Sequence, residues 1–381
     1  MRRRLLLVLA PVLFLGACTD ERQDVWSPEG EFADKVIGVQ WGVFVAAYVV
    51  GLLVAGAFVF IVIRYRVRRR KGDDGEVEEV DRPDPVQVHG NFRLEIAWTI
   101  IPAAILAAVA LFSVPTIFAV RGAQAFDERN LSVSVFGQQW WWSFEYDLDD
   151  DGEPEIVTAS DLVIPADADV ELIATSRDVI HSFWAPSLSG TIDVVPGREH
   201  RIVIQAGEPG VFDVQCKEYC GLAHAYMRAR VIALSDSEFA TWLDQQQQEW
   251  EEPDDPDALA GRDVFVARCA QCHVINGLRD AEGNEVELDV EAMPLLSGHA
   301  PNLTHLMSRG VFASGLLPLY DEDGNLNRPD LEQWLRNPDS LVPQNPDNEQ
   351  GMPDLGLTEG EIDQLVAFLQ TLGEPPPGAG G

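Results

Sequence analysis

Two long apolar stretches constrain the fold of this chain more than any other feature of its sequence. Residues 36–63 and residues 97–120 contain no charged side chain. Each run is at least as long as the roughly 20 residues that a helix needs to cross a bilayer. A basic segment, residues 64–71, follows the first run, and the positive-inside bias places such a segment in the cytoplasm. The sequence therefore predicts a transmembrane hairpin within residues 19–126, with the amino end and everything after Val120 outside.

The first 18 residues have the pattern of an export signal. Three arginines precede a short apolar run, residues 5–14, which is too short for a full membrane span. The run ends in Leu-Gly-Ala before Cys18, which resembles a lipobox, where cleavage would leave Cys18 as a lipidated first residue. An ordinary signal without lipidation is the alternative.

The charge balance excludes one class of partner. The chain has 27 basic and 62 acidic residues, which gives a net charge of −35. Such a chain repels the phosphates of nucleic acids, so we expect no nucleic-acid partner. The same charge attracts basic or cationic partners.

A compact group of metal-binding side chains lies within residues 214–227. Sulfur ligands favour copper in its lower oxidation state, and imidazole suits copper in either state, so this group predicts a copper site. Two thiolates on one loop can bridge a pair of coppers if a second histidine comes from elsewhere in the chain. The candidate ligands are Cys216, Cys220, His224 and Met227, with His181 as the second histidine. A zinc site or a disulfide is the alternative, although structural zinc motifs usually do not recruit a methionine.

Residues 127–235, which include this group, have the sequence pattern of a β domain. Residues 131–136 and 200–206 alternate polar and apolar side chains, and segments rich in Pro, Gly and Asp punctuate the region. Several such strands predict a sandwich or a barrel. Three consecutive tryptophans, Trp140 to Trp142, would alternate faces on a strand, so we expect at least one at the surface or against another surface.

A second cofactor motif lies beyond a helix and an acidic linker, which together occupy residues 236–257. The helix pattern covers residues 235–250, and residues 251–257 are acidic and broken by proline. Residues 258–373 then contain the C-x-x-C-H motif of a c-type haem, with Cys269 and Cys272 attaching the haem and His273 on one face of the iron.

The other face of the iron needs a ligand far along the chain. We predict Met352, because it stands shortly before a final helix that begins with a capping box from Thr358 to Glu361. The other available side chains are Met293, Met307, His299 and His305. The last residues, 374–381, are expected to be disordered.

The spacing of the copper ligands resembles that of the binuclear CuA site of cytochrome c oxidase subunit II. Residues 89–102 also resemble this family, whose second helix begins with a similar L-E-x-x-W-T-x-x-P. The resemblance implies that His181, Cys216, Cys220, His224 and Met227 bind the coppers, together with the backbone carbonyl of Glu218. It also implies that the Glu218 side chain reaches a Mg²⁺ at the boundary with subunit I.

The resemblance further implies three structural parts. These are a two-helix transmembrane hairpin, an all-β cupredoxin-like CuA domain and an all-α class I cytochrome c domain, since residues 298–309 and 334–338 resemble the cytochrome c extensions of some bacterial subunits II. In this family the first tryptophan of the aromatic run lies where a cytochrome c docks, so electrons are expected to enter at Trp140. Glu95 is expected either to admit protons to subunit I or only to cap its helix.

On this resemblance we expect an electron-transfer subunit of a haem-copper terminal oxidase in a bacterial cell membrane, with both cofactor domains outside. Electrons would pass from a cytochrome c or a cytochrome bc complex to the haem, to CuA and to subunit I, where oxygen is reduced and protons are pumped. Subunit III and membrane lipid are further expected partners. The alternatives are the CuA-bearing subunit of a nitric oxide reductase and a membrane-tethered copper-delivery protein. A quinol oxidase subunit is disfavoured, because such subunits lack these copper ligands.

Overall fold

The computed structural model describes residues 24–66, 69–71, 77–79, 87, 90–122, 131–149, 151–286, 300–345 and 350–376. The export signal with Cys18 lies outside these residues, as do two of the alternative haem ligands, Met293 and His299. The chain forms two compact units, one made of Lys35–Gly122 and the other of the residues before and after that stretch.

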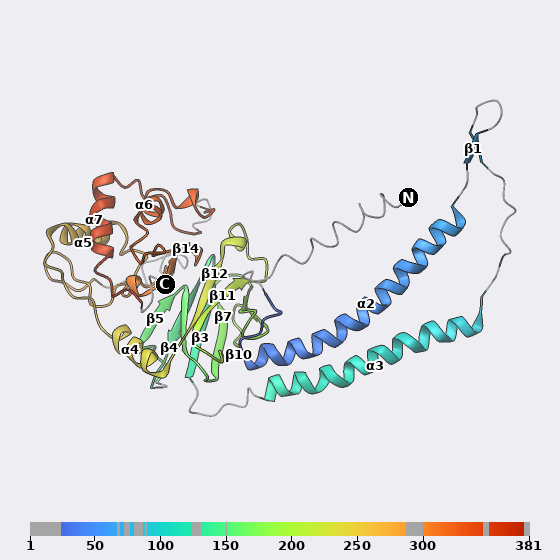
Figure 1. Cartoon of the computed structure of the whole chain (residues 1–381). Coiled ribbons are helices and arrows are strands. Elements are labelled where there is room, and N and C mark those ends of the chain that lie inside the picture. Colours follow the sequence, from blue (N-terminus) through green and yellow to red (C-terminus); the bar gives the residue numbers. More distant parts are fainter. Residues whose placement is uncertain are drawn as a thin grey trace. The chain divides into compact units, whose positions relative to one another are not determined.

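Two long helices, α2 (Glu31–Tyr65) and α3 (Phe92–Gly122), contain the two predicted apolar runs (Figure 1). Both helices are long and apolar enough to cross a membrane. Their large apolar side chains are mostly exposed, which suits surfaces that face lipid, where a helix satisfies its own backbone polar groups. A short antiparallel pair, β1 (Arg69–Lys71) and β2 (Val77–Glu79), lies between them in the sequence. The prediction of two long apolar helices is confirmed.

The β-rich region is a sandwich of two five-stranded sheets. One sheet has the order β10-β7-β3-β4-β5, and the other has the order β6-β12-β11-β8-β9. Most neighbours are antiparallel, but β3 pairs with β7, and β12 with β6, in parallel. The strands are β3 (Leu131–Gln138), β4 (Trp141–Tyr146), β5 (Ile156–Ala159), β6 (Asp161–Pro165), β7 (Val170–Ser176), β8 (His181–Trp184), β9 (Thr191–Val194), β10 (His200–Ile204), β11 (Gly210–Cys216) and β12 (Arg228–Leu234).

The core of the sandwich follows from alternation along the strands. In β12 every second residue is buried, as expected when one face of a strand packs against the opposite sheet. Tyr146 links the two sheets, because its hydroxyl donates to the carbonyl of Val163 at 2.9 Å and accepts from the amide of Val163 at 2.9 Å. The two predicted strands, residues 131–136 and 200–206, correspond to β3 and β10.

The helical region is built around two crossing helices, α5 (Pro256–Arg268) and α7 (Glu359–Leu369). Gly261 lies at the crossing, where a Cβ would overlap the carbonyl oxygen of Gln364 and lie 2.8 Å from the Cβ of Phe368. Phe265 packs beside Phe368 with ring centroids 5.4 Å apart. Shorter elements complete the region: α6 (Arg328–Arg336), β13 (Val311–Phe312) and β14 (Leu317–Pro318). The predicted capping box of α7 is confirmed, with Thr358 and Glu361 in their expected roles.

The helix that joins the two regions, α4 (Asp236–Gln246), begins at the predicted Ser235 cap but ends before the predicted residue 250. The chain leaves the helix there because Trp250 packs into the helical region, where its amide donates to the carbonyl of Asn276 at 3.0 Å. The sandwich and the helical region belong to the same compact unit. Tyr146 of the sandwich packs on Trp242 of α4 with ring centroids 5.2 Å apart.

Candidate metal centre and haem cavity

The five predicted copper ligands converge at one end of the sandwich. His181 begins β8 and Cys216 ends β11, and these two strands are paired. The loop after β11 carries Cys220, and a single 3-10 turn (His224–Tyr226) leads to Met227. The amide of Cys216 donates to the carbonyl of Met227 at 3.1 Å, which closes the loop. Strand pairing and one short loop therefore bring all five side chains together.

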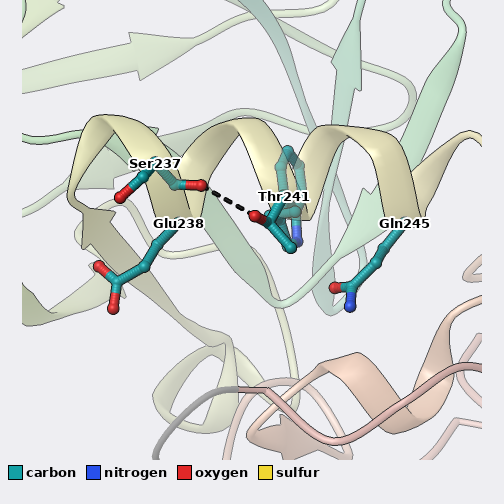
Figure 2. Close-up of a pocket in the computed structure, with 5 residues that line it drawn as sticks. Ser237, Glu238, Thr241 and Gln245 are labelled. Carbon is teal, nitrogen blue, oxygen red and sulfur yellow. Dashed lines mark hydrogen bonds between the residues drawn. The ribbon is translucent and has the colours of Figure 1, made fainter.

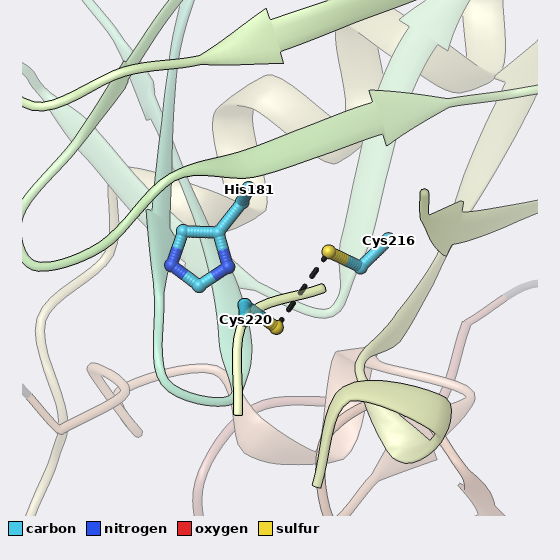
Figure 3. A group of neighbouring side chains, drawn as sticks. All are labelled: His181, Cys216 and Cys220. Carbon is cyan, nitrogen blue, oxygen red and sulfur yellow. Dashed lines mark hydrogen bonds between the residues drawn. The ribbon is translucent and has the colours of Figure 1, made fainter. Parts of the chain in front are cut away.

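The sulfur and nitrogen atoms of this group are close enough to share metal ions. The Sγ atoms of Cys216 and Cys220 are 3.8 Å apart, and both cysteines are free. Cys220 Sγ lies 3.6 Å from His224 Nδ1 and 3.8 Å from Met227 Sδ. His181, Cys216 and Cys220 each offer one ligand atom, and these three atoms lie within 4.8 Å of one another. All three residues are buried (Figure 3).

His181 is oriented as a metal ligand. Its Nε2 pairs with Asp178 Oδ1 at 2.7 Å, while its Nδ1 is buried without a hydrogen-bond partner among the described residues. Burial is the largest single influence and would lower the pKa of this imidazole, but Asp178 and Cys216 together outweigh it, so the pKa is raised. A carboxylate on the outer nitrogen of a histidine fixes the ring and makes the inner nitrogen a better ligand. A buried nitrogen without a partner, beside two thiols and a thioether, fits copper.

The two thiols titrate as a linked pair. A hydrogen bond from the Cys220 thiol stabilises the Cys216 thiolate, which lowers the pKa of Cys216 to about 4 and raises the pKa of Cys220. One proton therefore leaves the pair readily, and a bound cation is needed to displace the second, as coordinated thiols are deprotonated. Both cysteines can then serve as thiolate ligands.

Glu218 contributes its backbone to this group. Its carbonyl oxygen lies 3.2 Å from Cys216 Sγ, in the neighbourhood expected for the backbone ligand. Its side chain is exposed, and Glu218 does not belong to any of the metal-ligand groups found among the described residues. The Mg²⁺ site at Glu218 stays a prediction.

Glu95 caps the start of α3. Its Oε1 accepts from the amide of Asn91 at 3.1 Å, and Asn91 Oδ1 accepts from the amides of Arg93 and Leu94 at 3.2 and 3.3 Å. These bonds satisfy amides that a helix start leaves unpaired. The capping alternative therefore has a structural basis, and the role of Glu95 in proton uptake stays a prediction.

The tryptophan run departs from its prediction in one respect. Only Trp141 and Trp142 lie on β4, because the chain turns at Gln139 and Trp140 between β3 and β4. Trp140 is only 3% exposed, and its Nε1 donates to the carbonyl of Cys220 at 3.1 Å. We expected at least one tryptophan to meet another surface. Trp140 does so, because it lines a cavity that is also lined by residues of the helical region.

That cavity holds the haem-attachment motif. Its volume is about 650 Å³, within the range of cofactor sites. Cys269, Cys272 and His273 line it, together with Trp140 and Met352. His273 Nδ1 donates to the carbonyl of Pro301 at 2.8 Å, and burial lowers the pKa of its imidazole. The ring is thus neutral with Nε2 available, as an iron ligand requires. A c-type haem fits these residues.

The candidates for the second iron ligand separate in space. Met352 lines the cavity, whereas Met307 is buried away from it with its Sδ 3.8 Å from the Tyr320 hydroxyl. His305 is also absent from the cavity lining among the described residues. A different pocket, along α4, is lined by Ser237, Glu238, Thr241, Trp242 and Gln245 and contains no candidate haem or copper ligand (Figure 2).

The structure also brings together residues that sequence reasoning missed. Gln350 Nε2 donates to Gln139 Oε1 at 2.6 Å, and Gln139 Nε2 donates to the carbonyl of Cys220 at 2.6 Å. These two bonds connect the segment before Met352 with the copper loop. Neither glutamine stands in a sequence motif, so the sequence could not have identified them. Asp178, the partner of His181, could have been identified, because it is a carboxylate three residues before a predicted ligand.

Three families match successive parts of the chain. Residues 23–116 match the family described as cytochrome c oxidase subunit II, transmembrane domain. Residues 131–234 match the family described as cytochrome c oxidase subunit II, periplasmic domain. Residues 258–373 match the cytochrome c family.

Relatives extend over nearly the whole chain. Cytochrome c oxidase subunit 2 of Alkalihalophilus pseudofirmus is 34% identical and covers 94% of this chain and 94% of its own length. The protein of the same name from Bacillus sp. strain PS3 is 32% identical and covers 80% of this chain and 79% of its own length. The crystal structure of the periplasmic domain of subunit II of cytochrome oxidase (CoxB) of Bradyrhizobium japonicum is 29% identical, covers 32% of this chain and 96% of that one, and has a TM-score of 0.29.

The fold and the site together define a membrane-anchored electron-transfer protein with a periplasmic CuA-like copper domain and a cytochrome c domain. The chain belongs to the cytochrome c oxidase subunit II family. It is therefore a subunit of cytochrome c oxidase, and the resemblance drawn from its sequence is confirmed. This membership sets aside the nitric oxide reductase and copper-delivery alternatives.

Proposed function

We propose that this subunit accepts electrons from a donor on a covalently bound haem c and passes them through binuclear CuA to subunit I, where oxygen is reduced to water with proton pumping. The observation that carries this proposal is the position of Trp140. Its ring lines the cavity that contains Cys272 and His273, and its Nε1 donates to the carbonyl of the copper-loop residue Cys220. Trp140 is thus an aromatic side chain that touches both cofactor sites.

The residues of the copper loop hold the metal and fix its surroundings. His181, Cys216, Cys220, His224 and Met227 would bind the two coppers, with the Glu218 carbonyl as a further ligand, and the bound pair supplies one-electron redox chemistry. Asp178 holds His181 in the ligating orientation through the 2.7 Å bond to Nε2. Gln139 and Trp140 both donate to the Cys220 carbonyl and so fix the backbone of the loop.

The residues of the cavity hold the haem in a similar way. Cys269 and Cys272 would form the two thioether bonds, and His273 and Met352 would bind the iron. Met/His ligation favours a high reduction potential, which suits a carrier that takes electrons from a cytochrome c or a cytochrome bc complex. The net charge of −35 attracts a basic donor.

The remaining parts of the proposal concern the complex and the membrane. The helices α2 and α3 would sit beside subunit I in the bacterial cell membrane, with subunit III and lipid as further neighbours and the cofactor domains on the outer side. Glu95 would admit protons to subunit I, and Glu218 would hold a Mg²⁺ at the boundary with it. Cys18 would carry a lipid anchor.

Colour tests the copper assignment. The copper-loaded protein should show a purple mixed-valence chromophore, because two shared thiolates make the two coppers equivalent. Cys216→Ser and Cys220→Ser should each abolish it. Cys272→Ser, a matched cysteine change in the haem motif, should leave the purple band intact and reduce covalent haem attachment. Full copper content and colour after either change in the copper loop would contradict the binuclear site.

A further inference from the structure

Gln139 lines the haem cavity, and it is bonded to two parts of the copper site. Its backbone amide donates to Asp178 Oδ2 at 2.6 Å, and Asp178 Oδ1 pairs with His181 Nε2 at 2.7 Å. Its side-chain Nε2 donates to the carbonyl of Cys220 at 2.6 Å. His181 and Cys220 come from separate segments, β8 and the loop after β11. The position of Gln139 therefore depends on two predicted copper ligands at once.

The copper loop is shaped to receive the Gln139 side chain. A Cβ at Gly221 would lie 2.9 Å from Gln139 Nε2 and 3.2 Å from Trp140 Cζ2. The φ of Gly221 is +118°, which residues with a side chain rarely adopt, so glycine is needed for both conformation and space. The amide of Gln139 therefore packs directly on the backbone of the copper loop, and a shift of that backbone disturbs the hydrogen bond to Cys220.

On the other side, Gln139 holds the segment that carries Met352. Gln139 Oε1 accepts from Gln350 Nε2 at 2.6 Å. Gln350 is itself fixed by Asn345, because their backbone amides donate to each other's carbonyls at 3.0 and 3.1 Å and Asn345 Nδ2 donates to Gln350 Oε1 at 3.2 Å. Gln350 stands two residues before Met352, and both line the haem cavity. The bond between the two glutamines therefore bears on the position of Met352.

We propose that Gln139 and Gln350 couple the two cofactor sites, so that copper binding strengthens the bond from Met352 to the haem iron. The inference rests on the proposed function, since it requires copper at His181 and Cys220 and a haem in the cavity. Bound copper fixes both ligand residues, and with them the hydrogen bonds that hold Gln139 in reach of Gln350. Without copper these residues are free to shift, and the hold on the Met352 segment weakens.

The coupling acts in both directions. Two binding equilibria that share one set of contacts change each other by the same factor, so ligation by Met352 strengthens copper retention in turn. Met/His ligation also raises the reduction potential of a c-type haem. The haem then reaches its full potential only beside a loaded copper site, where an acceptor for its electron is present. Gln139 and Gln350 are positioning residues in this scheme, because they act through the ligands that they hold.

Carbon monoxide binding to the reduced haem of the full-length chain tests this inference. Carbon monoxide takes the iron position that Met352 would occupy, so its binding rate reports how readily Met352 leaves. The chain would be purified with and without copper and kept under reductant, so that Cys216 and Cys220 do not form a disulfide. One hydrogen bond typically changes an equilibrium roughly fivefold, so the copper-free chain should bind carbon monoxide roughly fivefold faster than the copper-loaded chain.

Two glutamine variants locate the coupling. Gln350→Leu removes the donor to Gln139 and should bind carbon monoxide at the copper-free wild-type rate whether or not copper is present. Gln333→Leu is the matched control, because Gln333 lies in the same region, donates to Ser340 Oγ at 2.7 Å and does not line the haem cavity among the described residues. It should keep the copper dependence of the wild type.

Copper affinity, measured in competition with a chelator, provides a second readout. It should weaken in Gln350→Leu and not in Gln333→Leu, although Gln350 is not a copper ligand. Equal carbon monoxide rates in the copper-loaded and copper-free wild type overturn the inference, and so does a copper dependence that persists in Gln350→Leu. If Gln350→Leu does not fold, the wild-type comparison decides alone. A wild type that attaches no haem or binds no copper would instead refute the proposed function, so the two failures are distinguishable.

Discussion

Replacing Gly310 with alanine should weaken the contact between the helical region that contains the haem cavity, called the haem region below, and the β-sandwich that carries the copper ligands, called the copper domain. The amide of Gly310 donates to Asp161 Oδ2 at 2.7 Å. An added Cβ would overlap Arg230 Nη2 and lie 2.8 Å from its Cζ. Arg230 cannot move freely, because both of its hydrogen bonds hold it on Asp161. The methyl group must therefore push Arg230 off Asp161 or move the Gly310 segment away from β12.

The size of the effect follows from the bonds at risk. A hydrogen bond to a charged group contributes about 1.5–3 kcal/mol, so losing one of them costs about 2 kcal/mol. Since 1.36 kcal/mol is a factor of ten, the undocked population of the haem region should rise roughly 30-fold. Other contacts would remain, such as the 2.9 Å bond from the Arg228 amide to the Ser314 carbonyl, so local loosening is expected rather than unfolding.

Rapid-mixing kinetics measure this loosening. The haem-to-copper step should slow in Gly310→Ala, while reduction of the haem by a basic donor should keep its wild-type rate. Gly360→Ala is the matched control, because a Cβ at Gly360 in α7 meets nothing within 4 Å. If Gly310→Ala transfers electrons to copper as fast as Gly360→Ala and unfolds at the same temperature, the Asp161 contact does not hold the two parts together.

Three further changes probe the site and its support. Met352→Ala should keep covalent haem but lower the reduction potential of the haem in redox titrations, since a sulfur ligand is lost. If Met307→Ala lowers the potential instead, the assignment of Met352 as the iron ligand is wrong. Trp140→Phe removes a donor to the Cys220 carbonyl, worth about 1 kcal/mol, and should slow the haem-to-copper step less than Trp140→Ala, which also removes the ring; equal wild-type rates in both variants would remove Trp140 from the route. Gly261→Ala should destabilise the haem region by about 1–3 kcal/mol in calorimetry, because its Cβ overlaps the Gln364 carbonyl, and an unchanged transition would contradict that close crossing.

The sequence predicted what short segments encode. The apolar runs, the haem motif and the capping box at Thr358 each lie within one stretch of chain, so periodicity and spacing were enough to find them. The copper loop was equally local, and only His181 had to be supplied from another strand. The turn at Trp140 was missed because adjacent aromatic residues carry no signal of where a strand ends.

Contacts between distant segments could not be predicted in this way. The Gln350–Gln139 bond joins residues 211 positions apart, and the bond from Gly310 to Asp161 spans 149 positions. Glutamine and glycine occur throughout the chain, so nothing local marks these particular ones.

The region between the two cofactor domains is held in place, and this changes how the haem meets the copper loop. The sequence predicts an acidic linker, residues 251–257, between the two domains. In the structure, Trp250 just before it is bonded to Asn276 and Thr371 at 3.0 and 3.1 Å, and Glu252 within it pairs with Arg262 at 2.6 Å. Trp140 is only 3% exposed in this arrangement, so we expect an external donor to reduce the haem first rather than to pass electrons directly to Trp140. On the proposed route, the surface that receives the donor would then belong to the helical region rather than to the copper domain.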